Sequence, residues 1–147
     1  MLDHDEIVRL YGPWRSRTPQ DAAARLADYG GPWWVAGGWA IDAFVGSHRE
    51  HGDLDLGIPR ESLEEFIDFA SPGLDVWAAA GSLTPLFGGS APRLPEGVGN
   101  LWLRANGAEP WEYDVMIESV KDGTWIFKRD ARISRPLIDC LWRYNCF

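Results

Sequence analysis

The chain has 147 residues, of which 46% are hydrophobic, and its formal net charge is −8. This length and composition exclude a disordered chain and predict a single domain over residues 1–147 with its own buried core. The acidic balance excludes a generic basic surface for nucleic acid, so nucleic acid is not an expected partner. An acidic surface suits a cationic small molecule, although many proteins carry such a charge for solubility alone.

The N-terminal residues, the lengths of the apolar runs and the cysteines together predict the cellular compartment. The first ten residues are charged where a signal peptide has an apolar segment, and no apolar run reaches the ~18 residues that cross a bilayer. The cysteines, Cys140 and Cys146, form neither a zinc motif nor a disulfide framework. We therefore expect a cytoplasmic protein without a membrane partner.

Two helices and a strand are predicted before the first functional motif. Asp3 can cap a helix that ends at Gly12-Pro13, and Thr18-Pro19 begins a second helix that runs to Gly30. Residues 33–36 are apolar and lie between glycines, which favours a short buried strand.

Gly37 and Gly38 follow this strand directly and are expected to open a helix. Trp39, Ala40, Ala43 and Phe44 recur after them at helical spacing. Glycines at a helix N-terminus let free N–H groups and the positive end of the helix dipole approach an anion. A glycine pair is also common in tight turns, so this feature alone is a weak predictor of phosphate binding.

Asp53 and Asp55 lie two residues apart within the apolar run that ends at Pro59, so on a strand both carboxylates point to one face. Like charges this close need solvent, a proton or a cation. A divalent ion such as Mg²⁺ is the usual cation near a phosphate-binding turn. The alternative is an exposed edge strand with acidic residues in water, which the bulky apolar neighbours disfavour.

The intervening segment holds further candidates. Arg49 suits either a phosphate or an aspartate, since its planar fork matches both. His48 and His51 allow a transition-metal site, but a histidine beside carboxylates more often orients one by a hydrogen bond. Asp42 lies one helical turn after Gly38, so it either faces the site or pairs with a nearby cation.

The string GGWAID followed by Arg49, His51, Asp53 and Asp55 in the pattern RxHxDxD resembles the nucleotidyltransferase superfamily of polymerase-β type. More narrowly it is similar to the aminoglycoside 2''-adenylyltransferase and lincosamide nucleotidyltransferase group. The resemblance implies an α/β (α+β) fold, in which helices pack against a mixed sheet. It also implies a third carboxylate on a later strand.

That third carboxylate is sought in the second half of the chain. Residues 60–70 are predicted to form an amphipathic helix, and residues 74–93 a partly looped region. Asn106-Gly107 predicts a hairpin between strands 101–104 and 111–117. In the second strand we expect the apolar residues, Trp111 included, on one face and Glu112 and Asp114 on the other. Asp114 is preferred because it lies in the apolar middle of the strand, whereas Glu112 is nearer the end, where a surface role costs less.

The last part of the chain is predicted to contain a strand at 124–127, a basic cluster at 128–135 and a short helix at 137–141. The basic cluster is either a solvated loop or a contact for triphosphate. Relatives continue into a helical C-terminal portion, and no such portion is expected in this sequence. The apolar residues 141–147 are expected to pack on the core or on another chain, which suggests a homodimer.

The resemblance therefore implies a Mg²⁺-dependent nucleotidyltransferase. Asp53, Asp55 and Asp114 would hold two Mg²⁺ ions and an NTP, probably ATP in such enzymes, while Gly37, Gly38, Arg49 and His51 would bind the nucleotide. The acceptor implied is a hydroxyl group of a small molecule, as in aminoglycosides. A non-catalytic nucleotide- or metal-binding module that acts through a protein partner is the alternative.

Overall fold

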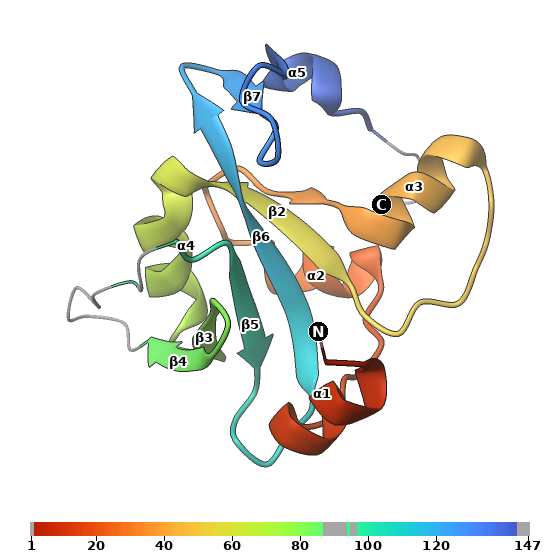
Figure 1. Ribbon diagram of the computed structural model, residues 1–147, viewed down its shortest axis with the longest axis vertical. Coiled ribbons are helices and arrows are strands. Elements are labelled where there is room, and N and C mark those ends of the chain that lie inside the picture. Colours follow the sequence, from red (N-terminus) through yellow and green to blue (C-terminus); the bar gives the residue numbers. More distant parts are fainter. Residues whose placement is uncertain (1, 87–93, 95–96, 144–147) are drawn as a thin grey trace.

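A computed structural model describes residues 2–86, 94 and 97–143 (Figure 1). Much of the loop predicted after residue 86 and the apolar end after residue 143 lie outside this range. The helices are α1 (His4–Tyr11), α2 (Pro19–Arg25), α3 (Gly37–Val45), the 3-10 turn η1 (Arg60–Ser62), α4 (Leu63–Ala70) and α5 (Leu137–Cys140). The strands are β1 (Trp34–Val35), β2 (Asp55–Pro59), β3 (Asp75–Ala79), β4 (Leu83–Leu86), β5 (Asn100–Arg104), β6 (Trp111–Lys121), β7 (Thr124–Ile126) and β8 (Ser134–Pro136).

The strands form one mixed sheet, so the predicted α+β fold class is confirmed. The main order is β1-β2-β6-β5-β3-β4, and β7 and β8 extend from the far end of β6. Among the strands that the structure describes, β2 and β6 pair in parallel and the other neighbours pair antiparallel. β3 and β4 form a hairpin within the region that was predicted to be partly looped.

The first two helices begin where the sequence predicts. The side chains of Asp3 and Thr18 each accept a hydrogen bond from the backbone N–H of the third residue of their helix. The side chain of that third residue accepts a bond from the backbone N–H of the cap residue. These capping boxes satisfy backbone N–H groups that a helix leaves unpaired. The second helix ends at Arg25, short of the predicted Gly30, and a turn follows in which the Tyr29 N–H donates to the Leu26 carbonyl at 3.0 Å.

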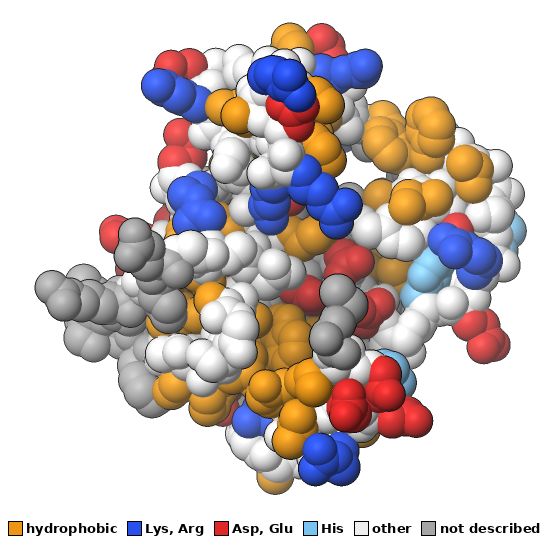
Figure 2. Space-filling model, viewed as in Figure 1, with side chains coloured by type: hydrophobic (Ala, Val, Ile, Leu, Met, Phe, Trp, Pro, Cys, Tyr) orange, Lys and Arg blue, Asp and Glu red, His pale blue; other side chains and the backbone are white. Residues whose placement is uncertain are grey.

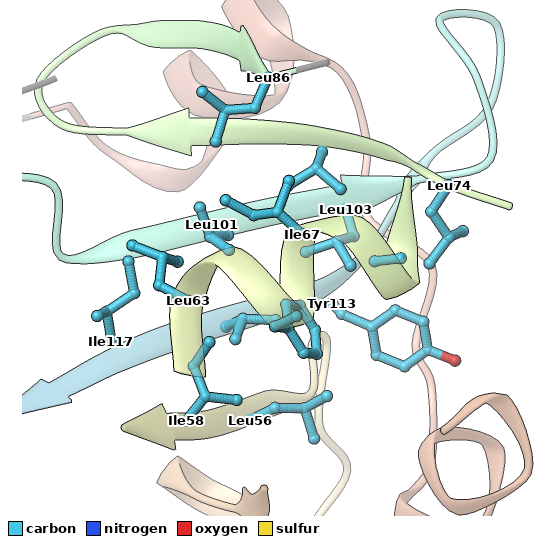
Figure 3. Close-up of a cluster of buried hydrophobic side chains, with 14 of the residues drawn as sticks. Leu56, Ile58, Leu63, Ile67, Leu74, Leu86, Leu101, Leu103, Tyr113 and Ile117 are labelled. Atoms are coloured by element: carbon cyan, nitrogen blue, oxygen red, sulfur yellow. The ribbon is translucent and has the colours of Figure 1, made fainter. Parts of the chain in front are cut away.

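One face of the sheet carries the hydrophobic core. Leu56, Leu101 and Val115 are buried on neighbouring strands. Leu63 and Ile67 of α4 project onto them (Figure 3). Burying such side chains contributes about 1.5–3 kcal/mol each relative to exposure. The core therefore fixes the direction of every alternate side chain on the opposite face.

We call that opposite face the site face. Its strand residues are mostly half-buried and include Asp55, Asn100, Trp102, Asp114 and Met116. Each alternates with a buried core residue, as the strand period of two requires. The burial patterns of β3 and β5 show the same alternation.

A register shift between β5 and β6 changes which face Trp111 occupies. Leu103 pairs with Tyr113, but Arg104 pairs with Trp111, so Glu112 is the extra residue of a β-bulge. Trp111 therefore shares the site face with its partner Arg104, whose guanidinium lies 4.1 Å from its ring centroid. The prediction that Trp111 shares a face with Tyr113, Val115 and Ile117 is wrong for this reason.

Tryptophans cover the β3–β5–β6 part of the site face near α1. The rings of Trp14 and Trp102 meet edge to face with centroids 5.1 Å apart, and Trp102 and Trp111 with centroids 5.5 Å apart. The Trp111 indole N–H donates to the Tyr11 carbonyl at 2.8 Å. This aromatic cluster buries Trp111 and ties the N-terminal segment to the sheet.

The predicted strand at 124–127 and helix at 137–141 are confirmed as β7 and α5, each slightly shorter. In the described part of the chain, no helix has both the length and the apolar character needed to cross a membrane.

Candidate functional site

Asp55 and Asp114 lie side by side at the centre of the site. They are paired residues of the parallel strands β2 and β6, so both side chains point to the site face roughly 4.8 Å apart at the backbone. Acidic side chains gather near the middle of the space-filling view, with basic ones above them (Figure 2). The structure thus brings together two carboxylates that are distant in the sequence.

The surroundings make both carboxylates harder to ionise. Burial raises the pKa of Asp114 to about 6, a hydrogen bond from Asn100 opposes this, and the charge of Asp55 adds to it. Burial and the nearby charge of Asp53 likewise raise the pKa of Asp55. The pair therefore carries a negative charge that the protein alone does not balance, and a cation would.

Asp53 lies beside the pair but not on the strand. β2 begins at Asp55, and Asp53 is an exposed residue in the bend before it. Within residues 2–86, 94 and 97–143, no group of three or more His, Cys, Asp or Glu side chains stands ready to hold a metal ion. Any site using Asp53 together with Asp55 and Asp114 would be completed by ligand oxygens or by movement of the bend.

Gly37 and Gly38 open α3 next to Asp55, as predicted. Gly37 has φ of +59°, and a Cβ there would lie 1.9 Å from Oδ2 of Asp55. Ala36 caps the helix without any side-chain hydrogen bond, and the first turn has no acidic residue. The first N–H groups of α3 therefore remain available to an anion beside the carboxylate pair.

Asp42 holds the loop between α3 and β2. Its carboxylate is buried and accepts hydrogen bonds from Ser47 Oγ at 2.8 Å, Arg49 Nε at 2.8 Å and Arg49 N at 3.1 Å. The His51 ring nitrogen Nε2 also lies 2.8 Å from it. Burial opposes ionisation, but these bonds together hold the pKa of Asp42 well below its usual range. Asp42 thus pairs with a nearby cation, one of the two predicted alternatives.

In this network Arg49 and His51 both bond to Asp42. The ring of His51 stacks on Trp39 with centroids 4.8 Å apart, and its Nδ1 lies 2.8 Å from where a Cβ of Gly38 would be. Arg49 keeps 60% of its side chain exposed while its Nε bonds to Asp42. His48 is exposed on the surface. A histidine that orients a carboxylate is the arrangement observed at His51.

Glu112 has a role that sequence reasoning missed. Its carboxylate is buried at the bulge and accepts hydrogen bonds from Arg17 Nε, at 2.8 Å, and from Nη2 of the same residue. The expectation of a surface role near the strand end is wrong, because the bulge turns Glu112 toward the segment before α2. Glu112 is thereby separated from the Asp55–Asp114 pair.

Asn100 and Trp102 were not predicted as site residues. The Asn100 amide Nδ2 donates to Oδ1 of Asp114 at 2.7 Å, and Trp102 pairs with Asp114 across β5 and β6. Their spacing of two on a strand was the available signal, since it puts both on one face. Their partner could not be known without the register.

Comparison with known proteins supports part of the resemblance. Residues 20–73 match the family model described as aminoglycoside-2''-adenylyltransferase. The match covers less than half of the chain: it runs from α2 through α4 and includes Gly37, Gly38, Asp53 and Asp55, but not Asp114. No curated protein and no solved structure matches the chain.

The fold and the site together define an α+β protein in which a helix that begins with two glycines lies beside a pair of carboxylates. Over residues 20–73 this arrangement coincides with the similarity to the family described as aminoglycoside-2''-adenylyltransferase.

Proposed function

We propose that this protein is a Mg²⁺-dependent nucleotidyltransferase. It would move a nucleoside monophosphate from an NTP, with ATP as the first candidate, to a hydroxyl group of a small molecule of the aminoglycoside type. The observation that carries the proposal is the Asp55–Asp114 pair beside the uncapped N-terminus of α3. Carboxylates for cations and free N–H groups for phosphates are what a nucleoside triphosphate with its metal needs.

The residues present fit Mg²⁺. Asp53, Asp55 and Asp114 offer only oxygen ligands, which this hard cation prefers. The raised pKa values of Asp55 and Asp114 reflect burial and the charges of neighbouring aspartates, whose repulsion a bound cation would offset. When bound, Mg²⁺ would lower the cost of charge that develops on the attacking and leaving oxygens.

The protein groups then have separate tasks. Asp114 accepts the proton of the acceptor hydroxyl while the oxygen of that hydroxyl bonds to the α-phosphorus of the NTP. The bond from that phosphorus to the bridging oxygen breaks, and pyrophosphate leaves with the electron pair. N–H groups of Gly37 and Gly38 bind the β- and γ-phosphates. The exposed guanidinium of Arg49 adds positive charge while Asp42 and His51 hold its loop.

The acceptor class follows from charge and from the family similarity. A net charge of −8 attracts cationic amino sugars to the site. Transfer of label from α-³²P-ATP to a panel of aminoglycosides and lincosamides, with Mg²⁺ present, tests this directly. We expect labelled product with the wild type and none with Asp53→Asn or Asp55→Asn, whereas the exposed Asp75→Asn variant should retain activity. Turnover retained in either site variant would refute the assignment.

Calorimetry with ATP and Mg²⁺, combined with the transfer assay, distinguishes the enzyme from a non-catalytic binding module. Binding of the nucleotide without transfer to any acceptor would favour the non-catalytic binding module.

We also propose that the protein forms a homodimer through the apolar surface of α3 and the segment after α5. Ile41, Phe44 and Val45 are exposed on α3, and Phe44 meets Trp142 with ring centroids 5.6 Å apart. Phe44 and Trp142 nevertheless remain 76% and 52% exposed. Sedimentation equilibrium should give a dimer that Phe44→Ser converts to monomer; a wild-type monomer at all concentrations would refute the dimer.

A further inference from the structure

Asn100 begins β5 on the site face, next to the third carboxylate of the proposed site. It pairs directly with Met116, so Asp114 is its diagonal neighbour on β6. Diagonal neighbours are within reach of side chains that are long enough. The Asn100 amide spans this distance and donates to Oδ1 of Asp114 at 2.7 Å, a short bond for an amide donor.

We propose that Asn100 is a positioning residue for Asp114, an inference that rests on the proposed function. Its amide commits Oδ1, so that Oδ2 is the oxygen left for a cation or for the acceptor proton. A carboxylate with one oxygen fixed has a defined orientation toward Asp55, its parallel neighbour. Hydrogen bonds of this kind to ligating carboxylates commonly change metal affinity or activity by about 10- to 100-fold.

Trp102 supports the same orientation from the directly opposite position. It pairs with Asp114 in register across β5 and β6. The Trp102 ring is fixed by Tyr11 and Trp14, with centroids 6.1 Å and 5.1 Å away. β5 therefore places the Asn100 donor and the fixed Trp102 ring beside Asp114.

A competing explanation is that the Asn100 bond serves stability alone, since a half-buried carboxylate needs a partner. The two explanations differ in what is lost when the bond is removed. A purely structural bond changes the free energy of unfolding but leaves the folded protein with normal metal affinity. A positioning bond lowers metal affinity and kcat in molecules that remain folded.

The test compares Asn100→Leu with Asn106→Leu. Asn106 lies in the turn beyond the other end of β5, where its Oδ1 accepts the Ala108 N–H at 2.9 Å, so the control removes one asparagine hydrogen bond far from the site. Mn²⁺ binding is measured by electron paramagnetic resonance with a non-hydrolysable ATP analogue. We expect Asn100→Leu to weaken Mn²⁺ binding about 10- to 100-fold and to lower kcat rather than raise the acceptor KM, while Asn106→Leu matches the wild type.

An additional variant keeps the test decisive. Asn100→Ser, which is polar but too short to reach Asp114, replaces Asn100→Leu if the latter does not fold. Mn²⁺ affinity within twofold of wild type for the folded Asn100 variants would overturn the positioning role. Wild-type protein that binds no Mn²⁺ with the analogue would instead overturn the proposed function, and this inference with it.

Discussion

Replacing Asp114 with asparagine is expected to stabilise the folded protein at neutral pH although it abolishes transfer. The reason lies in the raised pKa of this carboxyl group, which burial lifts from 3.8 to about 6 against the hydrogen bond from Asn100. A raised pKa means that the ionised form is less favourable in the folded protein than in the unfolded chain. An asparagine carries no such charge and can still accept a hydrogen bond.

The sign and size follow from proton linkage. Below pH 3.8 the carboxyl group is protonated in both states, so it contributes no difference. As the pH rises the unfolded chain ionises first, and the free energy of unfolding falls until the pH passes about 6. The full difference corresponds to about 3 kcal/mol at 1.36 kcal/mol per pKa unit. Asp114→Asn should therefore gain stability over wild type progressively across this window.

Urea unfolding of both proteins at about pH 4.5 and pH 8 measures the effect, with Asp75→Asn as the control for an exposed carboxylate. We expect the advantage of Asp114→Asn to grow by roughly 1–2 kcal/mol between these pH values. Adding Mg²⁺ and an ATP analogue should reduce this advantage, because only the wild type gains stability from the bound ligands. A stability difference that does not change with pH would refute the account of Asp114.

Two further predictions test the local geometry. Gly37→Ala and Gly46→Ala both impose a left-handed conformation on alanine, at a cost of about 1–2 kcal/mol each; only Gly37→Ala should abolish transfer, because its Cβ meets Asp55, whereas nothing lies within 4 Å of a Cβ at Gly46. Arg17→Met should lower the free energy of unfolding by about 3–5 kcal/mol, since it leaves the buried Glu112 carboxylate unpaired. The folded fraction of Arg17→Met should keep its transfer rate; a loss of rate would connect Glu112 to the site.

Local sequence patterns predicted most of the elements because their causes are local. Asp3 and Thr18 cap helices through groups three residues away, and Gly37 begins a helix with the conformation that glycine permits. Alternating apolar residues likewise fixed the core face of β5 and most of β6. The second helix ends before the glycine that marked its predicted end, because a turn closed by the Tyr29 N–H and the Leu26 carbonyl follows Arg25.

The remaining site features depend on pairings between distant residues. The bulge at Glu112 arises from the register between β5 and β6, which no window within β6 reveals. Arg17 is Glu112's partner from 95 residues earlier in the chain. Asn100 likewise becomes a neighbour of Asp114 only after the hairpin forms. Asp114 itself was predicted through a family resemblance and not from β6 alone.

The core explains why the two like-charged carboxylates stay side by side. Leu56 and Val115 follow Asp55 and Asp114 on their strands and are paired with each other, and they are almost wholly buried on the opposite face. Moving the two carboxylates apart would require β2 and β6 to slide or separate, which would expose both apolar side chains at about 1.5–3 kcal/mol each. Rotation of the side chains is the smaller adjustment, and the Asn100 bond restrains it for Asp114. The repulsion is therefore retained in the folded protein, where a divalent cation can relieve it.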